Sequence, residues 1–478
     1  MKLKVLLATL ALSSVVAQAQ VYSGPIQIKT GGTYTGNWES NNPDVPAVDV
    51  WTDQPVIIEN CNLRGTADMI RSYNRGNITV RNCNATSTST AAGNLERRHF
   101  ISTSGAVRII VENNYWEKML GVELYQFAGR GQNDQTVRIL RNVARNASIG
   151  FVGFNQCPDM AGVEIAYNQF INEPNFLRAE DNINFYHSSG TAVSPINVHD
   201  NYVQGSYPFP ALSPDFTGTG MTTDGTSSTT NVTSYIDAHD NQFVSNMNAA
   251  MNIAGGHHIR YHHNRMVTSS LLPDGTHLNS GWAATAVWNY ANHPLTLFNN
   301  NFIDNNVIGY MAADGRRDFS VCPIEKCYSN TFLPDPITVN TERNEWKLWN
   351  DKLAVKAVKI GSTQNFNQGT QSVGNGSNYA FGVANGTTTT PPTTPPTTPP
   401  TTPPTTPPTT PPTTALPTEG VSLKSKSSSK CLEIKNSSTA DGVQLTQNSC
   451  TGKANQKFIF LPLGSGKYQL KEIGRAHV

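Results

Sequence analysis

One pattern of apolar and polar positions recurs nine times between Val56 and Phe302: apolar, any, apolar, any, any, Asn or Cys, any, apolar. Alternate residues of a strand point to the same side, so the two leading apolar residues share a face. An Asn that recurs at one slot can bond its amide to the Asn above and below it. The pattern therefore predicts a coiled β-solenoid. The slot is filled by Cys61, Cys83, Asn114, Asn142, Asn168, Asn201, Asn241, Asn264 and Asn300.

The spacing of this ladder slot agrees with a solenoid. The slot advances by 22 residues from Cys61 to Cys83, which is about the length of a bare coil of three short strands. Longer steps elsewhere place loops on one side of the coils. The pattern resembles the right-handed parallel β-helix of the pectate-lyase-like superfamily, and we assign residues 20–386 to this all-β domain. The resemblance implies a carbohydrate-active protein, but it leaves the reaction open because hydrolases, lyases, epimerases and adhesins share the fold.

The N-terminus and the composition limit where the protein works. Residues 1–19 combine a basic start, an apolar run and Ala17-Gln18-Ala19, as in a secretory signal peptide, so we expect a secreted, extracellular protein. The net charge of +1 gives no indication of a nucleic-acid partner. No other segment is apolar enough to span a bilayer, so we expect no membrane partner. We also expect a monomer.

The seven cysteines are compatible with disulfides in an exported protein. Cys61 and Cys83 occupy the ladder slot of consecutive coils about 4.8 Å apart, which predicts a disulfide between coils. Cys322 and Cys327 would close a small loop. Cys431 and Cys450 belong together in the C-terminal region, and Cys157 is left as a buried thiol.

The C-terminal fifth of the chain has a different organisation. Residues 387–418 form a Thr-Pro linker, in which the Thr-Thr-Pro-Pro repeat favours extended polyproline II. Residues 419–471 resemble about one repeat of a ricin-type β-trefoil lectin, with Phe458 where the family has Trp. We interpret residues 472–478 as a non-native, adapter-derived tail on a truncated module. The resemblance implies sugar-binding roles for Glu433, Asp441, Gln444, Asn455 and Gln456.

A second strand precedes the ladder strand in each coil, and six of these strands align by their own alternation. They begin at Val122, Val152, Ile183, Met221, Met251 and Val287. Their second and fourth residues should point outward. This outward wall is rich in amide, aromatic and carboxylate groups, which suit a glycan groove better than a plain solvated face. The predicted substrate-binding residues are Glu123, Tyr125, Asn184, Tyr186, Asn252, Trp288 and Tyr290.

Two carboxylates on this wall are candidates for catalysis. Asp181 precedes one strand and Asp224 ends the next, which predicts a separation of about 7–11 Å. That range overlaps the spacing of about 6.5–9.5 Å at which inverting glycosidases hold a water between acid and base. A turn at Asp224 and a capping role for Asp181 are the structural alternatives. His187 and His257, at turns beside the wall, are further acid/base candidates.

A row of histidines lies on the ladder strand. His199, His239 and His262 share one slot, beside a slot that contains Asp200 and Asp240. A polar ladder on a solvated face explains them more simply than a divalent metal site, so we assign no metal ligand.

Sequence motifs of enzymes that share this fold bear on the type of reaction. Polygalacturonases carry Asn-Thr-Asp, Asp-Asp and Gly-His-Gly signatures, of which this chain keeps only fragments around Asp181 and His257. Pectate lyases use an Arg base with calcium, for which Arg260 near Asp237 is the local candidate. We expect a secreted glycoside hydrolase that acts on a plant or microbial polysaccharide and requires no cofactor. The alternatives are a polysaccharide lyase, which would use calcium, and a non-catalytic glycan-binding surface protein.

Overall fold

The computed structural model describes residues 20–90, 93, 98–215, 218–224, 228–272, 274–363, 421–425, 428–434, 445–464 and 467–472. Contacts divide the chain into two compact units, Met1–Thr389 and Thr390–Val478. The predicted signal peptide and Thr-Pro linker lie outside the described residues, as do Asp441, Gln444 and most of the predicted tail. In the described part of the chain, no helix is long and apolar enough to cross a bilayer.

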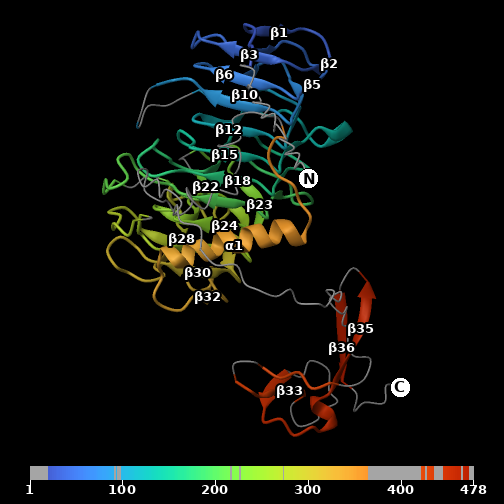
Figure 1. Ribbon diagram of the computed structural model, residues 1–478, viewed down its shortest axis with the longest axis vertical. Helices are drawn as coiled ribbons and strands as arrows, with labels where there is room; N and C mark the ends of the chain where they lie inside the picture. The colour runs from blue at the N-terminus through green and yellow to red at the C-terminus, as the bar shows by residue number, and fades with distance from the viewer. Residues whose placement is uncertain are drawn as a thin grey trace, which may run out of the picture. The chain divides into compact units, whose positions relative to one another are not determined.

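The first unit is a solenoid of three long parallel sheets, as the repeat predicted (Figure 1). Each coil contributes one strand to each sheet, so every third strand pairs in register. The first sheet contains β1 (Ile26–Ile28), β4 (Val48–Val50), β7 (Ile70–Ser72), β10 (His99–Ser104), β13 (Leu120–Tyr125), β16 (Val152–Asn155), β19 (Ile183–Tyr186), β22 (Met221–Asp224), β25 (Ala249–Ile253), β28 (Ala283–Val287) and β31 (Ser320–Val321).

The other two sheets flank the ladder slot. The second contains β2 (Gly32–Tyr34), β5 (Pro55–Glu59), β8 (Asn77–Arg81), β11 (Arg108–Glu112), β14 (Val137–Leu140), β17 (Glu164–Ala166), β20 (Ile196–His199), β23 (Ser234–His239), β26 (His257–His262) and β29 (Asn301–Asp304). The third contains β3 (Asn37–Ser40), β6 (Asn62–Gly65), β9 (Asn84–Ser87), β12 (Tyr115–Glu117), β15 (Val143–Arg145), β18 (Gln169–Ile171), β21 (Tyr202–Gln204), β24 (Gln242–Val244), β27 (Arg265–Thr268), β30 (Val307–Tyr310) and β32 (Thr331–Phe332).

The core is one continuous apolar column inside the coils. The leading apolar pairs of the repeat, such as Ile78 and Val80, are buried in it. Aromatic rings stack along the column, for example Phe151 on Phe170 with centroids 4.7 Å apart. The inward face of every strand is therefore used by the neighbouring coils, and only outward residues are left for chemistry.

A continuous ladder of asparagines crosses the bend between the second and third sheets. From Asn114 to Asn306, the backbone N–H and the side-chain Nδ2 of each Asn both donate to the Oδ1 of the next Asn; between Asn201 and Asn241 these bonds are 3.0 Å and 2.8 Å long. A single oxygen thus satisfies two buried donors of the preceding coil. The members are Asn114, Asn142, Asn168, Asn201, Asn241, Asn264, Asn306 and Asn330.

The ninth repeat was predicted in the wrong register. The ladder passes through Asn306, which receives both donors of Asn264, and not through Asn300, which is exposed. The backbone agrees, because the residue before each ladder slot has a left-handed conformation, and Asn305 has φ 55°. Several Asn residues occur together before β29, and the true slot lies six residues later than the pattern indicated.

The predicted Cys61–Cys83 disulfide is also wrong. Both residues are buried free thiols, as is Cys157. Their sulfurs instead approach backbone carbonyls, with Cys61 Sγ 3.0 Å from the Glu59 oxygen and Cys83 Sγ 3.3 Å from the Arg81 oxygen. Residues stacked in register keep their Cβ atoms about 4.8 Å apart, whereas a disulfide needs about 3.5–4.5 Å. The predicted pair Cys322–Cys327 does form a disulfide.

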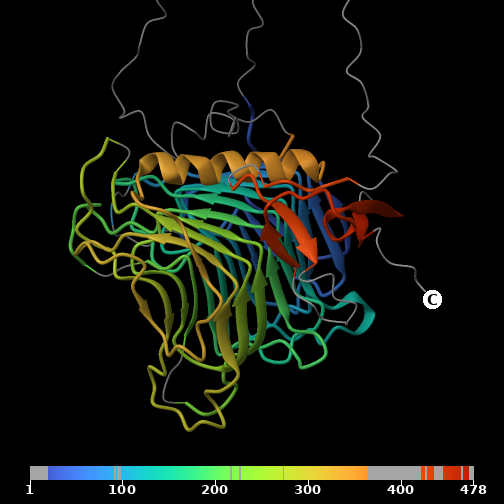
Figure 2. The same ribbon diagram turned by 90° about the horizontal axis from the view of Figure 1, so that it is seen from below.

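One helix, α1 (Val339–Val355), covers part of the third sheet, which the sequence did not predict. Seen along the solenoid, it lies flat across one side of the coils (Figure 2). Trp346 and Trp349 pack on Tyr202, and Trp349 Nε1 donates to Gln169 at 2.8 Å. Glu345 accepts two bonds of 2.7 Å from Arg265. The face of α1 that packs on the sheet is therefore partly polar, so a search for apolar periodicity does not detect this helix.

The C-terminal unit is described in two antiparallel pairs. β33 (Cys431–Ile434) pairs with β34 (Leu445–Asn448), and β35 (Phe458–Gly464) pairs with β36 (Lys467–Glu472). A bridge between Val421 and buried Phe458 links the start of the unit to β35. Cys431 and Cys450 form the second disulfide, with their Cα atoms 5.0 Å apart.

Candidate functional site

A groove of about 520 Å³ lies on the outward face of the first sheet. Its floor is built from β13, β16, β19 and β22, whose alternate residues point away from the core. The predicted residues Glu123, Asp181, Asn184, Tyr186 and Asp224 all line it. The structure therefore brings the two candidate catalytic carboxylates to one surface.

Asn184 joins the two carboxylates directly. Its Nδ2 donates to Asp181 Oδ2 at 3.1 Å and to Asp224 Oδ2 at 2.6 Å. These two bonds limit the separation of the two oxygens to about 5.7 Å. The pair is closer than the sequence argument allowed, because that argument counted strand spacing and ignored how side chains lean together.

The two carboxyl groups have different surroundings. Asp181 Oδ1 accepts a 2.6 Å bond from the Thr219 hydroxyl and a 3.3 Å bond from the Thr219 N–H. Burial raises the pKa of Asp224 to about 6, and the nearby charge of Asp181 adds to the effect, while the bond from Asn184 opposes it. Asp224 therefore carries a proton in mildly acidic solution, beside a carboxylate held by hydrogen-bond donors.

A missing side chain at Gly153 makes room for a third carboxylate. A Cβ atom at Gly153 would lie only 1.9 Å from Glu123 Oε2. Glu123 pairs in register with Gly153, and Gly153 pairs with Asn184 in the following coil. The Glu123 carboxylate therefore lies over the neighbouring coil and extends the acidic floor toward Asn184.

The charge of the groove is negative. Four carboxylates line it, from Glu123, Glu180, Asp181 and Asp224, and no Lys or Arg is among its described lining residues. Glu180 is ion-paired with Arg178, which reduces its contribution. His99, the one basic side chain of the lining, is bonded to Asp68 at 3.0 Å. A polyanionic ligand is therefore disfavoured here.

Several predicted binding residues lie beyond this groove. Tyr125, Asn252, Trp288 and Tyr290 are not among its lining residues. The first five aligned strand segments have the predicted register, but Met251 pairs with Thr285 and not with Val287. The sixth segment was thus misaligned by two residues. Trp288 and Tyr290 follow β28, where both are largely exposed and their ring centroids are 5.8 Å apart.

The two candidate histidines are placed differently from the carboxylates. His187 follows β19, is 9% exposed and lies edge-on to Tyr186, with ring centroids 4.6 Å apart. His257 begins β26 in the second sheet, where its Nδ1 lies 2.9 Å from Nδ1 of His258. Burial, together with the charge of His258, lowers the pKa of His257. Neither ring lines the groove.

The histidine row has the predicted register. His199, His239 and His262 stack with ring centroids 5.2 Å and 5.3 Å apart. Each ring bonds back to the preceding coil, as His262 Nε2 does to Asp237 at 2.8 Å. In the part of the chain that the structure describes, no group of three acidic, His or Cys side chains is arranged to hold a metal. This geometry agrees with a polar ladder.

Arg260, the candidate lyase base, forms an ion pair with Asp304. It donates two bonds, of 2.9 Å and 2.7 Å, to buried Asp304. Those bonds raise the pKa of Arg260 further above its usual value, which makes it a poorer base. It also lies on β26 in the second sheet, away from the groove residues.

Sequence reasoning missed two ionisable residues of the groove, His99 and Glu180. His99 opens β10, a strand of the first sheet that we had not aligned, and its backbone N–H also donates to Asp68 at 2.9 Å. Glu180 was considered only as part of a motif with Asp181. Extending the strand alignment back by one strand, to β10, would have found His99, since Ile101 pairs with Val122 and His99 pairs with Leu120.

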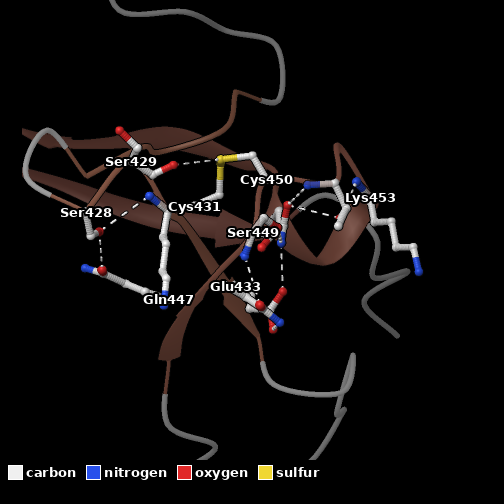
Figure 3. The surroundings of a disulfide bond; sticks show 12 residues. Ser428, Ser429, Cys431, Glu433, Gln447, Ser449, Cys450 and Lys453 are labelled. Atoms are coloured by element: carbon white, nitrogen blue, oxygen red, sulfur yellow. Dashed lines mark hydrogen bonds between the residues drawn. A yellow bond between two sulfur atoms is a disulfide. The ribbon is translucent and has the colours of Figure 1, made fainter.

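In the C-terminal unit, the predicted sugar contacts that the structure describes are Glu433, Asn455 and Gln456, and they form internal bonds in the unit that contains the disulfide (Figure 3). Glu433 accepts bonds of 3.0 Å from Asn448 and 2.8 Å from Gln456. Gln456 is fully buried, and its Oε1 accepts a 2.7 Å bond from the Thr451 N–H. Asn455 Nδ2 donates to the Ile434 carbonyl at 3.1 Å. In this arrangement Gln456 holds the loop after the disulfide.

The C-terminal unit is the part of the chain that matches a known protein family. Residues 413–476 match the family model described as ricin-type beta-trefoil lectin domain-like. The match indicates carbohydrate binding for this part of the chain and agrees with the resemblance seen in the sequence. Comparison with curated proteins found no match, and comparison with solved structures found none either.

Proposed function

We propose that the solenoid is a secreted glycoside hydrolase that cleaves a neutral polysaccharide, and that the lectin-like unit binds carbohydrate. The observation that carries this proposal is the pairing of Asp224 and Asp181 in one groove. One carboxyl group has a pKa raised to about 6 and the other is held by donors. Environments that differ in this way assign acid and base roles to two carboxyl groups.

The short separation favours a double displacement. Retaining glycosidases hold their carboxyl groups about 5–5.5 Å apart, with no water between them. Asp224 would donate its proton to the glycosidic oxygen while Asp181 attacks the anomeric carbon and forms a glycosyl ester. Asp224, now ionised, would take a proton from water, and the resulting hydroxide would release the sugar from Asp181. Asn184 would orient both carboxyl groups, and its amide would stay in place throughout.

The charge of the groove supports a neutral substrate. Uronate polymers carry a carboxylate on each ring and would meet the acidic side chains of Glu123, Asp181 and Asp224. A lyase reaction would in addition need a base, and Arg260 is bound to Asp304. A hydrolase acting on an uncharged chain therefore fits these residues better than a lyase.

The test uses the full chain and a panel of soluble polysaccharides: arabinoxylan, mixed-linkage β-glucan, galactan, mannan and polygalacturonate. New reducing ends report hydrolysis, and ultraviolet absorbance of unsaturated sugars reports a lyase. Asp224→Asn and Asp181→Asn should each lower turnover by about 10²–10⁴-fold on the neutral polymer that is cleaved. Asp274→Asn, at an exposed carboxylate outside the groove, is the matched control and should keep full activity.

Wild-type activity in both groove variants would refute the assignment of the pair. Unsaturated products would refute the hydrolase class. Proton NMR of the first product distinguishes retention from inversion of the anomeric configuration, and inversion would refute the double displacement.

A non-catalytic glycan-binding protein is the second candidate, and the lectin-like match of residues 413–476 favours it. It predicts saturable binding to a polysaccharide with no new reducing ends. Asp224→Asn would then leave every measured property of the protein on that polymer unchanged.

A further inference from the structure

A row of outward residues continues the groove along the solenoid. Tyr186 pairs with Asp224, and Tyr125 pairs with Asn155, all in one column of the first sheet. Ser104 pairs with Tyr125, and Ser102 pairs with Arg71, so Tyr73 stands beside Ser104. Asp49 pairs with Arg71, and the same register continued by two residues aligns Trp51 with Tyr73. Trp51 and Tyr73 thus hold the register position of Asp224 in earlier coils.

These two aromatic side chains are exposed where a sheet surface usually carries polar groups. Trp51 is 52% exposed and Tyr73 is 58% exposed. From Trp51 to Asp224 the column advances by six coils, which at about 4.8 Å per coil is about 29 Å. Such a length exceeds any mono- or disaccharide but suits a polymer that lies along the solenoid axis.

The Tyr73 ring is held in position although it is exposed. Its hydroxyl lies 3.4 Å from the Ser102 hydroxyl of the next coil. The Arg71 guanidinium lies 5.6 Å from the ring centroid and is paired with Asp49 at 3.1 Å. A ring fixed by its neighbours loses little freedom when a ligand covers it.

Polar groups connect this aromatic pair with the groove. A second hollow of about 150 Å³ lies against Tyr73 and Arg71 and is also lined by Asp68. Asp68 is bonded to His99 at 3.0 Å, and His99 lines the catalytic groove. The two hollows therefore share one bonded pair of side chains. Beyond Asp224, Trp288 follows in register with Ala254, so aromatic rings flank the carboxylates on both sides.

We propose that Trp51 and Tyr73 form a distal platform for the same neutral polysaccharide chain, which is bound along the solenoid axis and cut at an internal bond. This proposal rests on the proposed function of the groove. Sugar rings present C–H faces that pack on aromatic rings, while their hydroxyls meet polar groups such as Arg71 and Asp68. Carboxylates in the middle of the row then act on internal bonds.

The first experiment measures binding against ligand length. Asp224→Asn in the full chain keeps the ligand uncut, and Trp51→Ala and Tyr73→Ala are added to it singly. Calorimetric titrations use a trisaccharide and a decasaccharide of the β-glucan and arabinoxylan series. Each aromatic change should weaken decasaccharide binding by about ten-fold and leave trisaccharide binding unchanged. Phe332→Ala, at another exposed aromatic on the third sheet, is the control.

The second experiment follows the products of the wild-type chain. Internal cleavage should give medium-length oligosaccharides first and a rapid fall in the viscosity of the polymer. All variants retain the lectin-like unit, so its contribution to binding is the same in each titration.

The outcomes separate this inference from the proposed function. Cleavage of a polymer by the wild type together with unchanged decasaccharide binding in both aromatic variants would overturn the platform but keep the hydrolase. Release of only mono- or disaccharides from the start would overturn internal cutting. Absence of both binding and cleavage on the whole panel would overturn the proposed function, and the exposed aromatics would then be assigned to a protein partner.

Discussion

Replacing Glu342 with Gln should stabilise the protein in neutral and alkaline solution and should reduce the dependence of its stability on pH. Glu342 lies in the first turn of α1 and is 3% exposed. Its Oε1 accepts a 2.6 Å bond from the Ser269 N–H. Burial raises the pKa of Glu342 from an ordinary 4.5 to about 8, although the bonds from Ser269 oppose the shift.

The sign and the size of the effect follow from this pKa. Below pH 4.5 the group is protonated in the folded and the unfolded chain, and its contribution to stability is fully present. As the pH rises toward about 8, the unfolded chain ionises first, so the free energy of unfolding falls. At about 1.4 kcal/mol for each pH unit, the total loss is about 5 kcal/mol. If α1 can detach from the coils at a lower free energy than about 5 kcal/mol, the free energy of that local opening is the largest loss of stability that Glu342 can cause.

Urea unfolding at pH 5 and at pH 8.5 measures the effect, with tryptophan fluorescence as the signal because Trp346 and Trp349 lie on α1. The difference between wild type and Glu342→Gln removes contributions from other groups, including Asp224. Glu345→Gln is the matched control on the same helix. It removes the charge that pairs with Arg265 and one of the two accepting oxygens, and it should destabilise the protein by about 2 kcal/mol at both pH values.

The reasoning is refuted if the two proteins lose the same stability between pH 5 and pH 8.5. It is also refuted if Glu342→Gln is less stable than wild type at pH 8.5, because the buried carboxyl group would then be better tolerated as an anion.

Three further predictions test other parts of the molecule. The kcat/KM for the cleaved polymer should fall about ten-fold per pH unit above about 6, where Asp224 loses its proton; a profile that stays flat to pH 8 would contradict its role as the acid. A thiol reagent should label no cysteine in the native protein and three after denaturation, whereas a Cys61–Cys83 cross-link found by peptide mapping would contradict the structure. Asn201→Ala should lower the free energy of unfolding by about 3 kcal/mol because it leaves several buried groups unpaired, but Asn300→Ala should change it by less than about 0.5 kcal/mol; equal effects would restore the register first predicted.

The sequence was sufficient to predict the solenoid because its signal repeats. Most members of the ladder, from Cys61 to Asn264, lie at the predicted slot, since each coil must bury the same face. The prediction failed at Asn300 and at the strand before Trp288, where long loops interrupt the repeat. Helix α1 was missed because two of its buried residues, Glu342 and Glu345, are charged types.

The candidate site was predictable only in part. Strand alternation was enough to place Asp224 and Asn184 on one face, and the structure brings them together with Asp181. Alternation does not specify how far a side chain leans, so the bridging amide of Asn184 and the closer spacing were not foreseen. The wrong cysteine pairing has a similar cause: residues can be neighbours in a stack while their Cβ atoms point in parallel.

The asparagine ladder gives the solenoid a direction of growth. From Asn114 to Asn306, each Asn of the ladder donates its backbone N–H and an amide hydrogen to the following Asn, and its Oδ1 accepts from the preceding coil. A solenoid folded as far as Asn241 therefore ends in two waiting donors, and the next segment completes them with the Oδ1 of Asn264. At the opposite end, the Oδ1 accepts from the preceding coil and the amide Nδ2 donates to a carbonyl of that coil, as Asn241 does to Val198 at 2.8 Å. The two ends of a partly folded solenoid therefore differ, and a chain synthesised from its N-terminus presents the end whose donors the next coil completes.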